Sequence, residues 1–149
     1  MKTKQQSGFT LVELVMVIVL IGILAAIAVP RFVSLSGDAR KATVEGFAGG
    51  VKAAAVVAQA AWLAKGGAVS SISTADGQTV SVSSVQGLPL GTSAGIGVAM
   101  RCADTACDTF AATYGATTAF ELSSAPTPAS CKVSYTASDG TVSVTTSGC

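Results

Sequence analysis

The fold of this chain is decided by residues 9–29, which read FTLVELVMVIVLIGILAAIAV. Thr10 and Glu13 are the polar residues of this stretch, and no polar or charged side chain follows from Leu14 to Val29. A helix rises about 1.5 Å per residue, so a helix of this length would cross the hydrocarbon core of a bilayer, which is about 30 Å thick. The stretch therefore predicts a helix that spans a membrane.

The residues on either side of this stretch suggest its orientation and one alternative. Lys2 and Lys4 precede it, and positive charge favours the cytoplasmic side of a membrane. A cleaved secretory signal has the same layout, and residues 26–28 (AIA) would fit its cleavage site. Glu13 argues against a signal sequence because its carboxylate opposes insertion of the apolar segment. Both interpretations place the rest of the chain outside the cytoplasm.

Helical patterning continues beyond Pro30 to Lys65. Apolar side chains recur every three or four residues, which predicts an amphipathic helix that leaves the membrane. The apolar stripe consists of Phe47, Val51, Ala55, Ala58 and Trp62. Gly66 and Gly67 then favour a helix end, and the ring of Pro30 removes a backbone hydrogen bond, which predicts a bend. A single helix over residues 9–65 would be about 85 Å long.

The composition changes after Gly67 to Ser, Thr, Gly and Val with few charges, which is typical of β-sheet. Residues 79–85 and 96–100 are candidate strands within this part. We therefore predict an α+β fold in which one long helix packs on a small antiparallel sheet.

The clearest β element is a hairpin near the C-terminus. Residues 139–140 (DG) are a strong two-residue turn signal, and residues 131–137 and 141–146 alternate as strands do. A two-residue turn would place Tyr135 opposite Val144. Both strands would then bury the same face against the long helix.

The cysteines are Cys102, Cys107, Cys131 and Cys149. An even number beyond a membrane segment indicates an oxidising compartment and two disulfides, for which three pairings exist. The predicted hairpin register places Cys131 opposite Gly148 and next to Cys149, which favours that bridge and leaves Cys102 to pair with Cys107. A thiolate metal site is disfavoured because the spacings are not C-x-x-C and the chain has no histidine.

Composition also excludes several classes of function. Nine Lys and Arg against eight Asp and Glu give a formal charge of +1, without the basic block that nucleic-acid binding requires. The absence of histidine removes the usual general base, and no acid, base and nucleophile set can be assembled. Asp104 and Asp108 offer too few oxygen ligands for calcium. We therefore predict neither an enzyme nor a cofactor or metal site.

Residues 8–13 (GFTLVE), followed by the apolar run and Pro30, resemble the processing motif of type IV prepilins. Residues 30–40 (PRFVSLSGDAR) further resemble pilins of the mannose-sensitive haemagglutinin type. The prepilin resemblance implies that a membrane prepilin peptidase cuts between Gly8 and Phe9 on the cytoplasmic side and methylates the new amine of Phe9. It also implies a C-terminal loop closed by a disulfide.

Glu13 acquires a specific role through this resemblance. The Phe9 amine and the Glu13 carboxylate are four residues apart, about one helical turn, and both lie where an unpaired charge is costly. The family assigns their pairing to neighbouring subunits of a filament. The alternative is a carboxylate near a helix end that reaches the membrane surface.

The chain is thus expected to have four parts. These are a leader peptide over residues 1–8, a transmembrane and filament-core helix over 9–29, an amphipathic helix half over 30–65, and a β-rich head over 66–149. Phe9, Glu13 and Pro30 are the predicted assembly residues.

The leading functional prediction is the major structural subunit of a type IV pilus, a surface filament for adhesion. Its partners would be copies of itself, the prepilin peptidase and the inner-membrane assembly machinery, with no nucleic acid. It would be an inner-membrane precursor with a single span before it reaches the pilus on the cell surface. A type II secretion pseudopilin is one alternative, and a small secreted binding domain released after residue 28 is another.

Overall fold

The computed structural model describes residues 9–102 and 104–149, and for residues 28–34 it describes the backbone alone. The chain divides into two compact units between Gly37 and Asp38. Helix α1 (Leu11–Ala64) supplies the backbone of the first unit from Leu11 onward and one layer of the second. The backbone of Pro30 is helical, and its side chain lies outside the described part. The predicted effect of its ring therefore stays a prediction.

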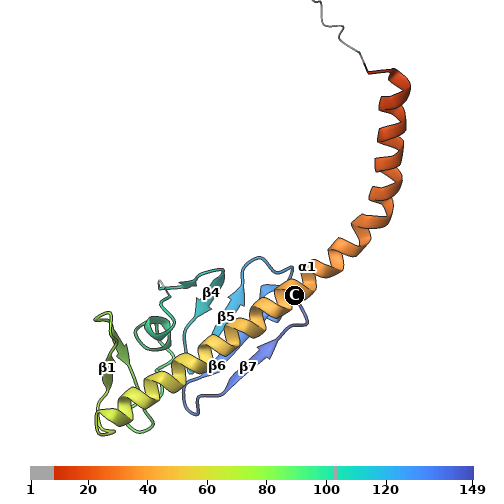
Figure 1. Cartoon of the computed structure of the whole chain (residues 1–149). Helices are drawn as coiled ribbons and strands as arrows, with labels where there is room; N and C mark the ends of the chain where they lie inside the picture. The colour runs from red at the N-terminus through yellow and green to blue at the C-terminus, as the bar shows by residue number, and fades with distance from the viewer. Residues whose placement is uncertain (1–8, 103) are drawn as a thin grey trace, which may run out of the picture. The chain divides into compact units, whose positions relative to one another are not determined.

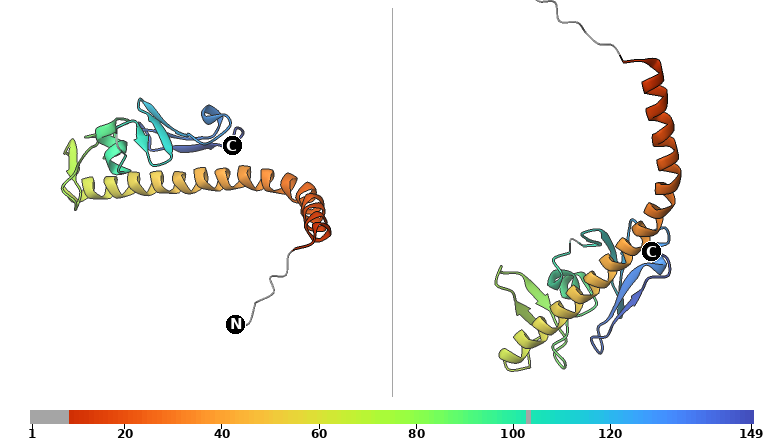
Figure 2. Two further views of the ribbon diagram at one scale, coloured as in Figure 1. Left: turned by 90° about the horizontal axis from the view of Figure 1, so that it is seen from above. Right: turned by 45° about the vertical axis from the view of Figure 1, so that its right-hand side comes forward.

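The second unit, Asp38–Cys149, is a two-layer α+β arrangement in which α1 lies across one face of an antiparallel sheet (Figures 1 and 2). The five-stranded sheet has the order β3-β4-β5-β6-β7, so each strand pairs with its neighbours in the sequence. Its strands are β3 (Ala106–Cys107), β4 (Phe110–Thr113), β5 (Thr117–Leu122), β6 (Lys132–Thr136) and β7 (Val142–Thr145). A separate hairpin joins β1 (Ser71–Ser73) to β2 (Thr79–Ser81). The predicted α+β fold is confirmed.

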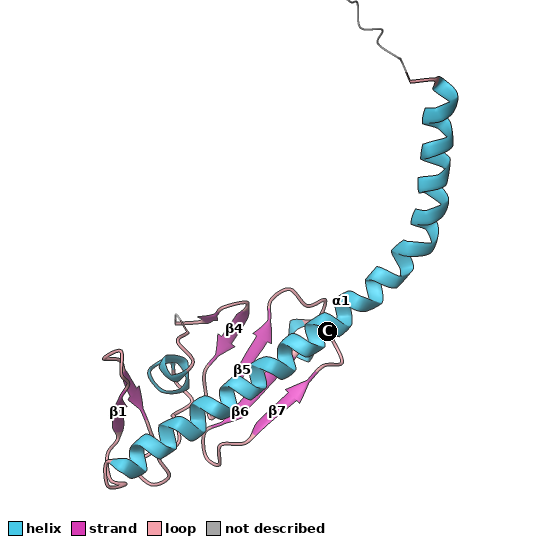
Figure 3. Cartoon of the chain, in the orientation of Figure 1, coloured by secondary structure: helices cyan, strands magenta, loops and turns pink. Residues whose placement is uncertain are grey.

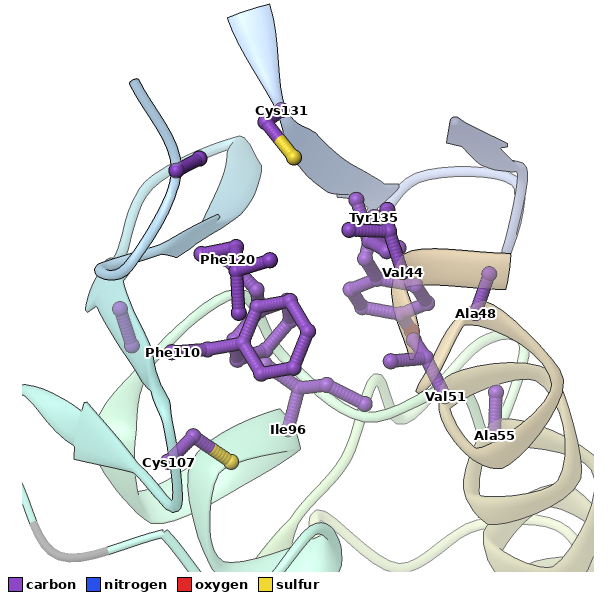
Figure 4. Packing of buried hydrophobic residues seen from close by; sticks show 14 of the residues in the cluster. Val44, Ala48, Val51, Ala55, Ile96, Cys107, Phe110, Phe120, Cys131 and Tyr135 are labelled. Atoms are coloured by element: carbon purple, nitrogen blue, oxygen red, sulfur yellow. The ribbon is translucent and has the colours of Figure 1, made fainter. Parts of the chain in front are cut away.

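The main core forms where the apolar stripe of α1 meets the sheet (Figure 4). The buried helix positions are Val44, Ala48, Val51 and Ala55, at intervals of four, three and four. They pack with Phe110 on β4, Phe120 on β5, and Val133 and Tyr135 on β6. Phe47 adds a stacked contact with Phe110 at 4.1 Å between ring centroids and an edge contact with Phe120 at 5.2 Å.

A smaller core lies under the β1–β2 hairpin and contains Trp62. The indole packs with Ile72 and Val80, and its Nε1 donates a hydrogen bond to the carbonyl of Val69 at 2.9 Å. Gly87 has φ of +70° and lies so close that a Cβ there would be 2.5 Å from the indole ring. Only glycine fits this position without displacing the tryptophan.

Two of the predicted strands are wrong in whole or in part. Residues 96–99 are helical, and Met100 lies in the turn that follows. Ser93–Gly97 forms a π-helical turn whose N-cap is Thr92, and the Thr92 hydroxyl accepts a hydrogen bond from the N–H of Gly95 at 3.0 Å. Ile96 is fully buried in that turn. A short apolar run is typical both of a buried strand and of a buried helical turn, so periodicity alone does not distinguish the two.

The other predicted strand, residues 79–85, is shorter than expected. β2 ends at Ser81, and the chain then turns, since the N–H of Gly87 donates to the carbonyl of Ser83 at 2.8 Å. Val85 lies in that turn with 80% of its side chain exposed. The alternating pattern of residues 79–85 therefore extends beyond β2, which ends at Ser81.

The C-terminal hairpin exists, but its predicted register is wrong by two residues. The loop has four residues, 137–140, since the N–H of Thr136 donates to the carbonyl of Thr141 at 2.9 Å. Tyr135 therefore pairs with Val142 instead of Val144. A two-residue type I′ turn needs positive φ at both Asp139 and Gly140, and only Gly140 has it, at 73°. Because the shift is even, each side chain stays on its predicted face.

The C-terminal loop is closed by a disulfide between Cys131 and Cys149, as the predicted fold class has it. The register would set Cys131 opposite Thr146, so the chain must turn to bring the two cysteines together. It does so through the N–H of Gly148, which donates to the carbonyl of Ser130 at 2.8 Å. The other two cysteines, Cys102 and Cys107, form the second disulfide.

Candidate assembly site

The start of α1 is organised by a reciprocal pair of polar residues. The Glu13 carboxylate accepts hydrogen bonds from the backbone N–H of Thr10 at 2.9 Å and from its hydroxyl at 2.6 Å. In return, the N–H of Glu13 donates to the Thr10 hydroxyl oxygen at 3.3 Å. This is a capping box, which satisfies backbone N–H groups that have no partner inside the helix. The Glu13 carboxylate therefore already has partners in the single subunit.

Sequence reasoning missed Thr10. The signature was present, because a Thr followed three residues later by Glu just before an apolar run is the sequence pattern of a capping box. The charge of Glu13 predicts a cation as its partner and does not by itself indicate the neighbouring hydroxyl.

Beyond this cap, α1 is apolar on every side as far as Ile27. From Leu11 to Ile27 the large apolar side chains are 44 to 78% exposed, and Phe9 just ahead of them is 86% exposed. A helix that is apolar all round is stable only inside lipid or protein. Leu11–Ile27 is therefore the surface of the described chain that most requires a partner environment.

The described residues of α1 include two apolar segments. By length and composition, Leu35–Ala64 could cross a membrane, and Leu11–Ile27 is the apolar segment that precedes residues 28–34. In Leu35–Ala64, however, the buried positions such as Val44 and Val51 pack with the sheet of the same unit. This segment therefore already has a buried face, whereas Leu11–Ile27 has exposed apolar side chains all round.

The predicted site residues lie in different parts of the chain. Gly8 is outside the described residues, so the predicted cleavage point has no structural account. Phe9 lies just ahead of α1, Glu13 lies in its first turn, and Pro30 is described by its backbone alone. The predicted pairing of the Phe9 amine with Glu13 stays a prediction, because that amine exists only after cleavage.

The C-terminal disulfide is linked to the helix through Arg40. Its Nε donates a hydrogen bond to the carbonyl of Cys149 at 2.5 Å, so the bridge between Cys131 and Cys149 fixes the end of the chain against α1. The end of the head is thus held both covalently and by a charge-assisted hydrogen bond.

The acidic residues of the head are distributed singly. Asp76 lies 3.2 Å from the Arg101 guanidinium, and a hydrogen bond from the Thr74 hydroxyl lowers the pKa of Asp76 below its ordinary value. Asp104 and Asp108 both have positive φ, a conformation that is uncommon for residues other than glycine but in which Asp is enriched. In the part of the chain that the structure describes, no three Asp, Glu, His or Cys residues gather as a metal site.

An apolar recess lies beside the smaller core. It has a volume of about 300 Å³ and is lined mainly by α1 and the β1–β2 hairpin, including Ala58, Ala61, Ile72 and Val80. No Lys, Arg, Asp or Glu is among the described residues that line the recess. The recess offers apolar contact and no acid or base chemistry.

Comparison with known proteins identifies the same end of the chain. Residues 3–29 match the family model described as the prokaryotic N-terminal methylation motif. The chain is 57% identical over 51 residues to the type IV narrow pilus major component PilA5 of Thermus thermophilus, a match that covers 34% of this chain and 44% of that protein. It is 46% identical over 46 residues to the type II secretion system core protein G of Pseudomonas aeruginosa, which covers 31% and 32%. No solved structure gives a significant match.

These matches confirm the resemblance to type IV pilins that the sequence predicts. They do not confirm the mannose-sensitive haemagglutinin type. The similarity spans less than half the length of both curated relatives. It extends to about a third of this chain.

Proposed function

We propose that this chain is the structural subunit of a type IV pilus, a filament in which the subunits pack through their N-terminal helices. The observation that carries the proposal is the combination of the methylation motif over residues 3–29 with the exposed apolar surface of residues 14–27. A helix with that surface needs lipid first and the helices of other subunits afterwards.

The maturation that we propose follows from the motif. A prepilin peptidase hydrolyses the peptide bond between Gly8 and Phe9 on the cytoplasmic side, and the new Phe9 amine is methylated. The precursor spans the inner membrane once through residues 9–29. The inner-membrane assembly machinery then transfers it into the pilus on the cell surface, with the head of residues 66–149 facing water and mediating adhesion.

Glu13 would change partners during this process. In the single subunit its carboxylate is bonded to Thr10. In a water-free filament core a carboxylate also needs a cation, and the processed Phe9 amine of the same or a neighbouring chain supplies it. We propose that this pairing sets the position of each subunit relative to the next.

The proposal is tested by mass spectrometry of the chain in filaments sheared from cells. A mature chain that begins at N-methylated Phe9 is the expected result. Gly8→Val should leave the uncut precursor in the membrane and no filaments, whereas Gly22→Val, in the middle of the apolar helix, is the control for a changed glycine away from the cleavage point. A mature N-terminus at Val29 would instead identify a secreted domain released from a signal sequence.

A second candidate is a type II secretion pseudopilin, which the similarity to core protein G favours. The same shearing experiment separates the two. A major pilin appears as long surface filaments at native expression, whereas a pseudopilin is processed at the same bond and yields no such filaments at that level. Deletion of the gene would then block protein secretion.

A further inference from the structure

The five-stranded sheet ends in an open edge at β7 (Figure 3). Among the described strands, β7 pairs only with β6, through the register Tyr135 to Val142 and Val133 to Val144. The other edge of β7 faces no described strand. An unpaired strand edge presents backbone donors and acceptors that can pair with a further strand.

The hydrogen bonds of the hairpin show which groups lie on this edge. Thr136 and Thr141 are bonded to each other, since the N–H of Thr136 donates to the carbonyl of Thr141. In an antiparallel pair the bonding direction alternates from one residue to the next. The N–H and carbonyl groups of Val142 and Val144 therefore point away from β6.

The side chains at this edge are also incompletely covered. Val144 lies beside the fully buried Val133 on the core face of the sheet, yet 40% of its side chain is exposed. Val142 beside Tyr135 is half-buried. The core thus has an open margin at β7 that an added strand would cover.

The segment lacks the features that usually protect an edge strand. Residues 141–149 (TVSVTTSGC) contain no charged residue and no proline, and the pairing of β6 with β7 is continuous, without a bulge. The strand is also held in place at its end by the disulfide between Cys131 and Cys149. A preordered edge loses little conformational entropy when it pairs.

We propose that the β7 edge is a self-association surface, on which β7 of one copy pairs antiparallel with β7 of a second copy. The backbone groups that point away from β6 can bond to those of the second copy when Val144 lies opposite Val144 and Val142 lies opposite Thr146. Each Val144 side chain then covers the other on the same face of a continuous sheet.

The second copy is the occupant that the charges favour. Lys2, Lys4, Arg31 and Glu13 precede residue 38, so the second unit has six basic and seven acidic residues and a formal charge of −1. Low net charge permits association of identical molecules. A charged peptide would find no countercharge between Thr141 and Cys149.

The symmetry of this pairing decides its consequence, which rests on the proposed function. A contact in which β7 meets β7 is two-fold symmetric and closes after two copies, so it cannot propagate a helical filament. It would join subunits of two different filaments side by side. Because the contact repeats at many subunits along two filaments, weak individual pairs add up to a strong attachment between the filaments. The expected product is a lateral bundle.

The experiment introduces opposite charges at Val144 in two separate variants, in cells that make the full chain. Filaments of Val144→Lys subunits and filaments of Val144→Glu subunits should each lose lateral bundling, because like charges then face each other directly. A mixture of the two purified filaments should bundle again. Val85→Lys places the same charge on an exposed residue far from β7 in the sequence and should leave bundling unchanged. Ser143→Lys is a second edge variant that alters no side chain on the core face.

Electron microscopy and low-speed sedimentation of sheared filaments measure the bundles. The proposal is supported if wild-type and Val85→Lys filaments bundle and each edge variant gives single filaments. Filaments of Val144→Lys and of Val144→Glu should bundle only when the two are mixed. It is overturned if wild-type filaments are single, if the edge variants bundle as the wild type does, or if the mixture stays single. Absence of filaments from wild-type cells would instead count against the pilus function itself.

Discussion

Glu13 and Thr10 satisfy each other at the start of α1, with the carboxylate accepting from both the N–H and the hydroxyl of Thr10. Glu13 therefore has two properties, a capping role and a negative charge, which can be tested separately. The side chain caps the helix, for which a Glu or a Gln is suitable, and it carries a negative charge, which only Glu supplies.

Glu13→Gln should keep the cap and delete the charge. We expect normal membrane insertion, normal cleavage after Gly8 and a folded head, together with loss of surface filaments, because the Phe9 amine would remain unpaired. The loss on breaking a buried pair is about 3 to 5 kcal/mol, and it recurs at every subunit. Sheared filament yield, compared with the amount of processed chain in the membrane, measures the effect.

Thr10→Val is the matched control, because it removes the capping hydroxyl and keeps the charge of Glu13. It should cost about 1 kcal/mol of helix stability and leave filaments on the cell. If Thr10→Val abolishes filaments and Glu13→Gln does not, Glu13 acts as a cap and the proposed pairing is wrong.

The buried and exposed faces of α1 in the second unit predict different effects for the same substitution. Val51 is fully buried against the sheet, whereas 67% of Val57 is exposed. Val51→Ala should destabilise the head by about 2 kcal/mol, from the lost apolar contact and the cavity left behind. Val57→Ala should be neutral, since alanine is also the better helix former. Urea unfolding of the detergent-solubilised full chain, followed by near-UV circular dichroism, compares the two; equal losses would contradict the packing of α1 on the sheet.

The two disulfides should contribute unequally to head stability. The bridge between Cys131 and Cys149 closes a separation of 18 residues, and the bridge between Cys102 and Cys107 closes only 5. The chain-entropy account gives about 3 kcal/mol for the longer loop and about 2 kcal/mol for the shorter one. Paired Cys→Ser variants test this difference by urea unfolding. Non-reducing peptide mapping checks the pairing, and any peptide that links Cys102 to Cys131 or Cys149 would contradict it.

The sequence predicted sustained periodic patterns better than it predicted loop geometry. The stripe from Val51 to Trp62 predicts the buried face of α1, because a period of 3.6 sustained over several turns is specific to an amphipathic helix. The register of the C-terminal hairpin was not predictable, because residues 139–140 fit both a two-residue and a four-residue loop. Which loop forms depends on whether Asp139 adopts positive φ, and composition does not decide that.

The same contrast holds for the candidate assembly site. Gly8, Phe9 and Glu13 were recognisable because a motif of fixed spacing combines with an apolar run. The hydrogen bonds of Arg40 with Cys149 and of Tyr135 with Pro89 join residues far apart in the sequence. No local pattern marks such contacts, and they appear only when the sheet and helix are placed together.

The two tyrosines of the chain differ in what their hydroxyl groups contact. The Tyr135 hydroxyl is buried and donates to the carbonyl of Pro89 at 2.8 Å. The Tyr114 hydroxyl is buried without a hydrogen-bond partner among the described residues. Tyr135→Phe leaves the Pro89 carbonyl unsatisfied and should cost about 1 to 2 kcal/mol at neutral pH. Tyr114→Phe should cost almost nothing, so urea unfolding of the two variants gives a direct comparison.

The same pair predicts how head stability depends on alkaline pH. Burial, with a smaller contribution from the nearby charge of Asp139, raises the pKa of Tyr135 to about 12, from an ordinary value of about 10 in the unfolded chain. A raised pKa means that the protonated phenol stabilises the fold. Its contribution is complete below pH of about 10 and is lost as the pH rises to about 12.

In the Tyr114→Phe background Tyr135 is the sole tyrosine, so ultraviolet absorbance reports its ionisation alone. We expect a midpoint near 12 in the folded chain, and a lower midpoint near 10 once urea has unfolded it. Adding Tyr135→Phe should remove this part of the alkaline destabilisation. A folded-state midpoint near 10 would mean that the phenol reaches water and that the hydrogen bond to Pro89 does not hold β6 to the loop before η1 (Ser93–Gly97).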